Sequence, residues 1–464
     1  MPEYFGIIAL ASIGLLAAAC GDNDADIDAA LDAALDAAED ARPQTDASTL
    51  DATTDSAVDA AQVSDGPNIL LIIADDLGLD SSAQYDVSAD APNTPVLDSL
   101  AATGIVFDEA WATPACTTTR GTLISGLHGV HSGVDFVPAV LSPTIRTLHA
   151  YLAEHAPEYA TAIVGKWHLG GRAPDLNAPA IAGAGYYAGT IAGVIDDYFD
   201  WDLITGGEQV PQTAYHTTAM TDLAIDWIDA QEGPWFMWLA YVAPHIPFHA
   251  PPESLHTRTL LGTPADIRNN RRQYYLAAIE AMDREIGRLL DTLSSEAREN
   301  TLIIFLGDNG TPSLAVDANV FDSARAKNTL YEGGVRVPLV VSGAGVSRQG
   351  VRDAALVHTV DLFPTLLHIL GVSAALPLDG ESFSEVLSRE DAGTREFNYT
   401  EFVSDAVTGW AVRDVRYKLI HFEDGTEELY DLSVDLREES NLIADAALQE
   451  RIVRLAAYGA LQRD

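Results

Sequence analysis

Residues 68–74 read NILLIIA, and two aspartates, Asp75 and Asp76, follow them directly. A continuous apolar run of this kind is typical of a strand that is buried on both faces of a parallel sheet. Similar runs recur at TAIVGK (161–166), WFMWLAYV (235–242), TLIIFLGD (301–308) and VPLVVSG (337–343). Helical segments such as QYYLAAIEAMDREIGRLLDTL (273–293) lie between them. This alternation predicts an α/β fold, with a large mixed, mostly parallel sheet flanked by helices.

Polar side chains follow several of these predicted strands. In α/β sheets, ligands bind beyond the carboxyl ends of the strands, so these residues are the candidates for a functional site. Asp75 and Asp76 follow one strand, and Asp308 and Asn309 follow another. Four oxygen donors that converge at one edge of a sheet suit a hard cation, calcium or magnesium. Paired acids after a single strand are often only helix caps, and the second pair strengthens the prediction of a metal site.

The stretch ACTTTRGTLISG (115–126) places Cys116 at the start of a predicted helix, with Arg120 four residues further on. The positive end of a helix dipole stabilises anions, so Cys116 is a candidate nucleophile, although a buried inert cysteine is the alternative interpretation. Further cations and titratable groups are Lys166 and His168 in GKWHLG, His245 in APHIPF, and Lys327 in RAKNTLYEGG.

The chain has 464 residues, with 26 basic and 69 acidic side chains and a formal net charge of -43. A surface of this charge argues against nucleic acid or an anionic membrane surface as a partner. Any anionic substrate would need a local cluster of cations or a metal ion.

The N-terminal region has the pattern of an export signal. Residues 4–19 form a short apolar run, and Ala17-Ala18-Ala19-Cys20-Gly21 resembles a bacterial lipobox, in which Cys20 carries lipid. No Lys or Arg precedes the run, and Ala17 stands where Leu is more usual. We expect a signal peptide over 1–20, export to the bacterial cell envelope (periplasm or outer surface), and anchoring through Cys20. With Cys20 lipidated, Cys116, the only other cysteine, has no disulfide partner.

Two further segments complete the predicted organisation. Residues 21–65 are nearly all Asp, Ala, Thr and Ser, too polar to bury a core, and we interpret them as a disordered tether. From residue 396 onward, NYTEFV, GWAVRD and YKLIHFEDGTEELYDL predict a small antiparallel sheet, and a helix is expected over about 445–462. The prediction is a catalytic domain over 66–395 and an α+β subdomain over 396–464.

Taken together and in order, these motifs resemble a sulfatase of the alkaline phosphatase superfamily. The matching stretches are PNILLIIADDLG, ACTTTRGTLISG, GKWHLG, PHIPFHAP, LGDNG, KNTLYEGGVRVPLVVSG and WAVRDVRYKLIHFEDGTEELYDL. They span roughly residues 66–464. The resemblance implies an alkaline phosphatase-like fold and hydrolysis of a sulfate ester to an alcohol and inorganic sulfate.

The resemblance also implies a role for each candidate residue. Cys116 is converted to formylglycine by a formylglycine-generating enzyme, and the aldehyde hydrate supplies the nucleophilic hydroxyl. One calcium ion, with magnesium as the less favoured ion, is bound by that residue together with Asp75, Asp76, Asp308 and Asn309. Arg120 and Lys166 hold and polarise the hydrate. His245 and Lys327 contact the sulfate and assist the leaving oxygen. His168 takes the proton from the second hydroxyl, which expels sulfate and restores the aldehyde.

One residue departs from the family pattern. The maturation motif is usually Cys, any residue, Pro or Ala, any residue, Arg, and Thr118 stands at the Pro position. The converting enzyme reads the unfolded segment, so Thr118 weakens the motif. We still expect conversion, because the flanking RGTLISG is family-like.

Two alternatives and one open question accompany this prediction. A phosphoester or phosphonate monoester hydrolase could share the fold, but its zinc site typically carries an Asp-His pair where this chain has Asp308-Asn309. A non-catalytic binding protein is the second alternative, supported only by Thr118. The substrate stays open among sulfated polysaccharide, aryl sulfate and sulfolipid. We expect variable loops over 171–215 and 311–326 to form the rim, and the overall charge favours a small substrate unless that rim is basic.

Overall fold

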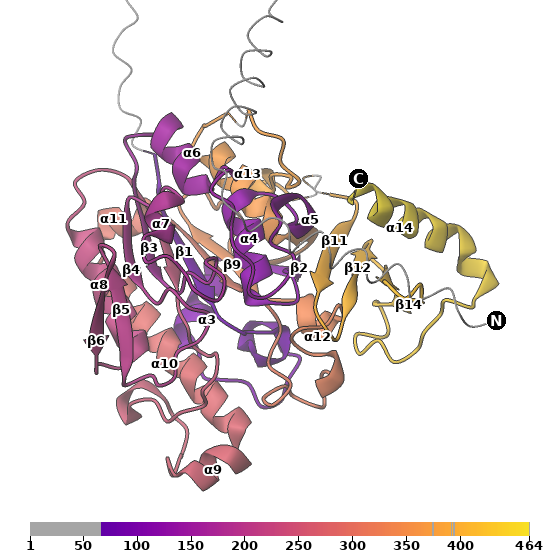
Figure 1. Cartoon of the computed structure of the whole chain (residues 1–464), viewed down its shortest axis with the longest axis horizontal. Coiled ribbons are helices and arrows are strands. Elements are labelled where there is room, and N and C mark those ends of the chain that lie inside the picture. The colour runs from indigo at the N-terminus through magenta and orange to yellow at the C-terminus, as the bar shows by residue number, and fades with distance from the viewer. Residues whose placement is uncertain (1–65, 374, 391, 393–394, 464) are drawn as a thin grey trace, which may run out of the picture. The chain divides into compact units, whose positions relative to one another are not determined.

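A ten-stranded sheet forms the centre of the fold, with the strand order β10-β2-β9-β8-β1-β7-β3-β4-β5-β6 (Figure 1). The computed structural model describes residues 66–373, 375–390, 392 and 395–463. The ten strands are β1 (Asn68–Ala74), β2 (Gly104–Trp111), β3 (Ala160–Gly165), β4 (Tyr186–Gly189), β5 (Trp201–Thr205), β6 (Glu208–Gln212), β7 (Trp235–Ala240), β8 (Thr301–Gly307), β9 (Leu339–Gly343) and β10 (Val351–His358).

The five central strands, β8-β1-β7-β3-β4, all run parallel. Strand β1 lies in the middle of this group and is buried along its whole length. Its register pairs Ala74 with Gly307 of β8 and Ile73 with Ala240 of β7. The carboxyl ends of β1, β7 and β8 therefore lie side by side, and the residues that follow them meet at one edge of the sheet.

Helices cover both faces of this sheet (Figure 1). Alternate residues of β1 belong to two separate cores, one containing Ile69 and Leu71 and the other containing Leu70 and Ile72. Helices α4, α6 and α13 contribute to the first core, and α3, α8 and α10 to the second. The helices are α3 (Pro95–Ala102), α4 (Cys116–Ser125), α5 (Gly129–Ser132), α6 (Leu148–His155), α7 (Ala178–Ile181), α8 (His216–Asp229), α9 (Pro264–Asn269), α10 (Arg271–Thr292), α11 (Ser295–Glu299), α12 (Glu332–Val335), α13 (Leu362–Ile369) and α14 (Gln449–Leu461).

A second, antiparallel sheet follows near the C-terminus, in the order β11-β12-β13-β14. Its strands are β11 (Asn398–Val403), β12 (Thr408–Arg413), β13 (Tyr417–Phe422) and β14 (Glu427–Asp431). Helix α14 packs on one face, where Ile452 and Leu455 join a core with Trp410 and Leu419. The opposite face buries Ile420 among residues that include Trp111 at the end of β2. Both sheets thus belong to one compact unit.

The structure confirms the mixed, mostly parallel sheet with flanking helices and the separate antiparallel sheet. It corrects two details and adds two strands that the sequence did not reveal. Strand β9, which we took for a strand of parallel type, runs antiparallel to both β2 and β8, because burial on both faces sets composition and not direction. The segment 171–215 is not simply a loop, since it contains β4, β5 and β6. The added strands are β2 and β10, which lack a continuous apolar run because polar residues interrupt both.

Two other predictions lie outside what the structure tests. The signal peptide, Cys20 and the tether over 21–65 fall outside the described residues. The division of the chain at residue 395 stays a prediction. Within the described part of the chain, the structure contains no helix that is both long and apolar enough to cross a membrane.

Candidate active site

Four polar side chains that follow β1 and β8 lie together at the carboxyl edge of the sheet. The backbone N–H of Asp308 donates to Ala74 O at 3.0 Å, which continues the β1–β8 ladder one residue beyond the strands. The N–H of Asp76 donates to Asp308 Oδ1 at 2.9 Å. Asn309 Nδ2 donates to Asp76 Oδ1 at 2.9 Å, and its own Oδ1 has no hydrogen-bond partner among the described residues. The strand register thus places Asp75, Asp76, Asp308 and Asn309 in one buried cluster.

This cluster has the chemistry of a cation site. Among the residues that the structure describes, Asp75 Oδ1 and Asn309 Oδ1 accept no hydrogen bond although both are buried. Buried polar atoms are normally paired, so two unpaired oxygens in one cluster indicate a further partner, either a water or a cation. Carboxylate and amide oxygens are the donors that calcium and magnesium prefer. Asp75, Asp76 and His245 also hold one potential ligand atom each within 4.8 Å of one another. The residues therefore fit a hard divalent cation.

Three cationic side chains surround the carboxylates. Lys166, which follows β3, lies with its Nζ 2.5 Å from Asp75 Oδ2. Arg120 on α4 donates from one guanidinium nitrogen to Asp308 Oδ2 and from another to the backbone oxygen of Lys166, both at 2.8 Å. Lys327 pairs with Asp76. The three acids and three cations give a cluster of nearly balanced charge, which is a condition for burying them together.

Burial raises the pKa of the three buried acids, and the neighbouring cations lower it. Burial, reinforced by the charge of Asp75, raises the pKa of Asp308 to about 6. Burial also raises the pKa of Asp75, against the opposing charge of Lys166. For Asp76, burial acts in the same direction, but Lys327 and His245 outweigh it and lower the pKa to about 2. A cation bound here would therefore compete with protons on Asp75 and Asp308, whose pKa values are both raised.

Cys116 is the first residue of α4, and its side chain contacts an imidazole. Cys116 Sγ lies 3.1 Å from His168 Nδ1, and Thr117 Oγ1 lies 3.1 Å from His168 Nε2. Burial raises the pKa of the Cys116 thiol, although Lys166 and Lys327 oppose this effect. Burial, followed by the charges of Lys166 and Arg120, lowers the pKa of His168 well below its usual value. A neutral imidazole thus faces a protonated thiol, and its Nδ1 can accept a proton from residue 116.

His245 enters the cluster from the loop that follows β7. Its Nδ1 lies 2.7 Å from the Ile246 carbonyl oxygen, which can only accept, so Nδ1 carries the proton. Nε2 then faces Asp76 Oδ2 at 3.6 Å. Burial lowers the pKa of His245 to about 3 despite the charge of Asp76. The predicted residues Cys116, Arg120, Lys166, His168, His245 and Lys327 all lie in or against the carboxylate cluster.

The backbone at the site is strained. Asp76 has a φ of 70°, His168 a φ of 57°, and Asn328, next to Lys327, a φ of 67°. Non-glycine residues rarely adopt this left-handed region, and each such residue costs roughly 1–3 kcal/mol. Strain of this kind persists where the surrounding structure holds the chain in place, and here it aims two site side chains into the cluster.

Thr118, at the unusual position of the motif, has a structural partner. It is the third residue of α4 and is buried, and its hydroxyl donates to Ala115 O at 2.8 Å. It also contacts the hydroxyl of Thr113. The folded protein therefore accommodates Thr at this position without disturbing Cys116.

Sequence reasoning missed two neighbours of His168. Thr117 contacts the second ring nitrogen, and nothing in the run CTTTR singles out this threonine. Gly193 lies against the ring itself, since a Cβ added there would come within 2.1 Å of His168 Nε2. Contacts between segments this far apart along the chain are set by tertiary structure alone.

The fold and the site together define a hydrolase in which carboxylates and cations meet at the carboxyl ends of parallel strands. The family model of the sulfatases matches residues 67–372, and the model described as N-sulphoglucosamine sulphohydrolase, C-terminal, matches residues 320–458. The chain therefore belongs to the sulfatase family and is a sulfuric ester hydrolase.

Individual relatives agree with this assignment. A sulfatase of Formosa agariphila is 28% identical and is matched over 83% of this chain and 86% of its own length. The uncharacterized sulfatase YidJ of Escherichia coli is 27% identical over 82% of this chain and 83% of its own. Among solved structures, that of Ps i-CgsB in complex with k-i-k-neocarrahexaose has a TM-score of 0.73 at 25% identity and is matched over 86% of this chain and 94% of that one.

Proposed function

We propose that this sulfatase hydrolyses its ester with a formylglycine made from Cys116 and with one calcium ion bound by Asp75, Asp76, Asp308 and Asn309. One observation carries the proposal: residue 116 lies within reach of His168, beside buried acid and amide oxygens that have no partner in the described part of the chain. Cys116 Sγ stands where one hydroxyl oxygen of a hydrated aldehyde at this residue would lie. That hydrate would supply a nucleophilic oxygen. The ion would supply positive charge that stabilises the negative charge of the sulfate oxygens and of the ionised nucleophile.

The cations of the site neutralise the negative charge of the substrate and of the nucleophile. A sulfate ester is an anion attacked by an anionic nucleophile, so the site must neutralise both. Lys166, which follows β3, and Arg120, on α4, are both fully buried. In this proposal they hold the residue-116 side chain in its ionised form. Lys327 is partly exposed and, with His245, contacts the sulfate and assists the leaving oxygen.

His168 acts as the base that releases sulfate. Its lowered pKa keeps the imidazole neutral at pH 7, and Nδ1 faces residue 116. It takes the proton from the second hydroxyl of that residue. The bond between the side-chain carbon and the sulfate oxygen then breaks, sulfate leaves, and the aldehyde is restored. Thr117 holds the opposite ring nitrogen and so orients the imidazole for this transfer.

Maturation and location belong to the same proposal. A formylglycine-generating enzyme converts Cys116 before the chain folds, and the chain is exported to the bacterial cell envelope and anchored through lipid at Cys20. Calcium, with its flexible coordination, fits the four protein donors better than magnesium, which keeps most of its waters.

The experiment compares matured protein with two variants. Mass spectrometry of the peptide containing residue 116 measures conversion. Hydrolysis of 4-nitrophenyl sulfate is then measured beside that of 4-nitrophenyl phosphate. We expect sulfate to be hydrolysed faster, and activity to be lost in Cys116→Ala and to fall at least about 100-fold in His168→Gln. An unmodified thiol in active enzyme would refute the formylglycine, and faster phosphate hydrolysis would refute the sulfatase activity.

A further inference from the structure

A cavity of about 400 Å³ is lined in part by the segment 190–195, which contacts the loop that carries Lys166 and His168. This segment continues from β4 and bonds directly to the loop, since Trp167 N–H donates to Thr190 O at 3.0 Å and His168 N–H to Ile191 O at 3.3 Å. A few residues later, Tyr198 donates its hydroxyl to His245 O at 2.7 Å. Ile191, which lines the cavity, therefore bonds directly to His168, and Tyr198, a little further along the same segment, bonds to His245. The cavity lies next to the loop of His168, at the edge of the sheet where the sulfate would bind.

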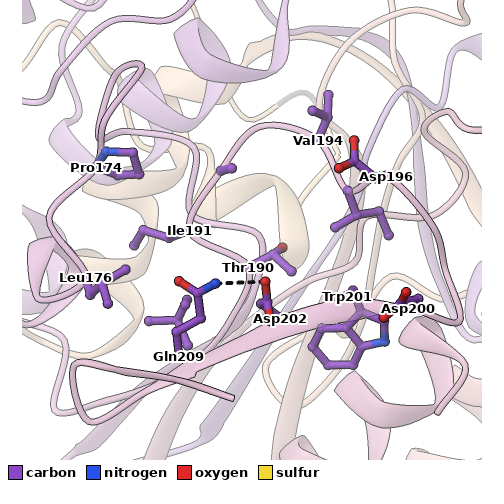
Figure 2. A pocket seen from close by; sticks show the side chains of 13 residues that line it. Pro174, Leu176, Thr190, Ile191, Val194, Asp196, Asp200, Trp201, Asp202 and Gln209 are labelled. Atoms are coloured by element: carbon purple, nitrogen blue, oxygen red, sulfur yellow. Dashed lines mark hydrogen bonds between the residues drawn. The ribbon is translucent and has the colours of Figure 1, made fainter. Parts of the chain in front are cut away.

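The lining of the cavity suits an organic group that carries hydroxyls. Leu176, Ile191, Val194 and Trp201 supply apolar surface, with Leu176 and Ile191 on the side opposite Trp201 (Figure 2). Thr190 also lines the cavity, and its Oγ1 is buried with no hydrogen-bonding partner among the described residues. A buried hydroxyl without a partner is rare in a folded protein and indicates that a ligand or water completes it. Few polar groups on an apolar wall are typical of a small-molecule site.

Three aspartates give this cavity a negative charge. Asp196, Asp200 and Asp202 line it and are exposed (Figure 2). Within the described part of the chain, none of them forms an ion pair; Asp202 accepts a hydrogen bond from Gln209 at 2.8 Å. The whole segment 171–215 contains six acids and one base, Arg172. The rim beside the sulfate site is thus acidic, whereas the cations of the site itself are already paired with carboxylates.

We propose that this cavity binds the alcohol part of the substrate and selects against negative charge there. The substrate class that fits is a monosulfate ester of a neutral or amino-bearing alcohol, such as an uncharged or amino sugar, rather than a polysulfated chain. This inference rests on the proposed sulfatase mechanism. At ~10 Å in water, each carboxylate weakens the binding of a ligand that carries one negative charge roughly twofold. Three carboxylates together therefore weaken it about eightfold.

The test uses three aryl sulfates that share one leaving group. These are the 7-sulfates of 7-hydroxycoumarin-4-acetic acid, of its amide and of its 2-aminoethyl amide, which differ by one unit of charge at a remote position. We expect kcat/KM to rise about eightfold from acid to amide and again from amide to amine, mainly through KM. The ratios should shrink on raising the salt to 1 M, where charges are screened over ~3 Å.

A charge-neutral variant isolates the cavity. Asp196→Asn/Asp200→Asn/Asp202→Asn removes the three charges without touching the core. Asp229→Asn is the matched control, since Asp229 is exposed at the end of α8 and does not line the cavity. The triple variant should bring the three kcat/KM values within about twofold of one another, whereas the control keeps the order. Far-ultraviolet circular dichroism and Tm confirm that both variants are folded.

Binding to Cys116→Ala, which cannot be converted, separates this inference from the mechanism. Equilibrium fluorescence titration with the same three sulfates should give the same order of Kd. Hydrolysis without any preference for charge, or a triple variant that behaves like Asp229→Asn, overturns the charge selection alone. The expected order in binding with no hydrolysis by matured protein overturns the mechanism alone. Equal binding of all three sulfates and no hydrolysis overturn both.

Discussion

Asp308→Asn tests the cation site without a large change of shape. Asp308 is fully buried, and its two oxygens accept from the Asp76 N–H and from Arg120. Asn keeps an oxygen for the Asp76 N–H but removes one negative charge. Burying a carboxylate whose pKa is about 6, about two units above its usual value, costs about 3 kcal/mol at neutral pH. Asn avoids this cost but deprives Arg120 of its nearest acid, and because these effects oppose each other, we expect the metal-free Tm to change little.

The response to calcium should change much more. At a calcium concentration 100 times Kd, binding stabilises the native protein by about 2.7 kcal/mol. For a domain of about 400 residues, with an unfolding entropy of about 0.8 kcal/mol/K, this raises Tm by about 3 °C. Loss of a partner outside the coordination shell already weakens metal sites about 10- to 100-fold, so removing the negative charge from a direct donor should cost about 100-fold. At the same calcium concentration, the variant should then gain only about 0.4 kcal/mol, or about 0.5 °C.

Differential scanning calorimetry of chelator-treated protein, with and without added calcium, measures both quantities. Asp229→Asn is the control, because it removes the same charge from an exposed position at the end of α8. A full calcium-induced rise in Asp308→Asn would refute the assignment of Asp308 as a ligand. So would a wild-type protein whose Tm does not respond to calcium at all.

Three further predictions concern pH, maturation and stability. Because a proton on Asp308 competes with the cation, calcium affinity measured by isothermal titration calorimetry should fall about tenfold per pH unit below pH 6 and stay nearly constant above it. Thr118→Pro should increase the formylglycine content measured by mass spectrometry, and should cost about 1 kcal/mol in urea unfolding through loss of the hydroxyl bond to Ala115. Lys418 lies buried between Glu332 at 3.1 Å and Glu438 at 2.9 Å, so Lys418→Met should cost about 3–5 kcal/mol in unfolding free energy, and adding Glu438→Gln should recover part of it.

Each of these predictions has an outcome that contradicts it. Calcium affinity that is equal at pH 5 and pH 7 would show that Asp308 carries no competing proton. Equal formylglycine content in Thr118→Pro and in the wild type would show that Thr118 does not limit conversion. A Lys418→Met variant as stable as the wild type would show that the two glutamates are satisfied without the lysine.

The central buried strands and the polar residues at their ends could be predicted from the sequence. Runs such as NILLIIA are so apolar that they can only be buried on both faces, and the chemistry of a parallel sheet then falls at their carboxyl ends. This placed Asp75 and Asp76 beside Asp308 and Asn309 before any distance was known. The second sheet was equally predictable, because short alternating strands with a turn at Asp424-Gly425 specify it locally.

Other features depend on contacts that no local pattern encodes. The direction of β9 follows from its connections, since a strand buried on both faces has the same composition in either direction. The contact of Thr117 with His168 and the packing of Gly193 on the same ring join residues between about 25 and 50 positions apart along the chain.

The sequence alone therefore determined the family, the kind of sheet and the set of candidate ligands and cations, because these depend on residue type and on strand-end position. The tertiary structure decided which carboxylate pairs with which cation, which histidine nitrogen faces residue 116, and that the rim beside the site is acidic. These are matters of distance and burial, because a pKa shifts only when separate segments bring charges together or remove a group from water.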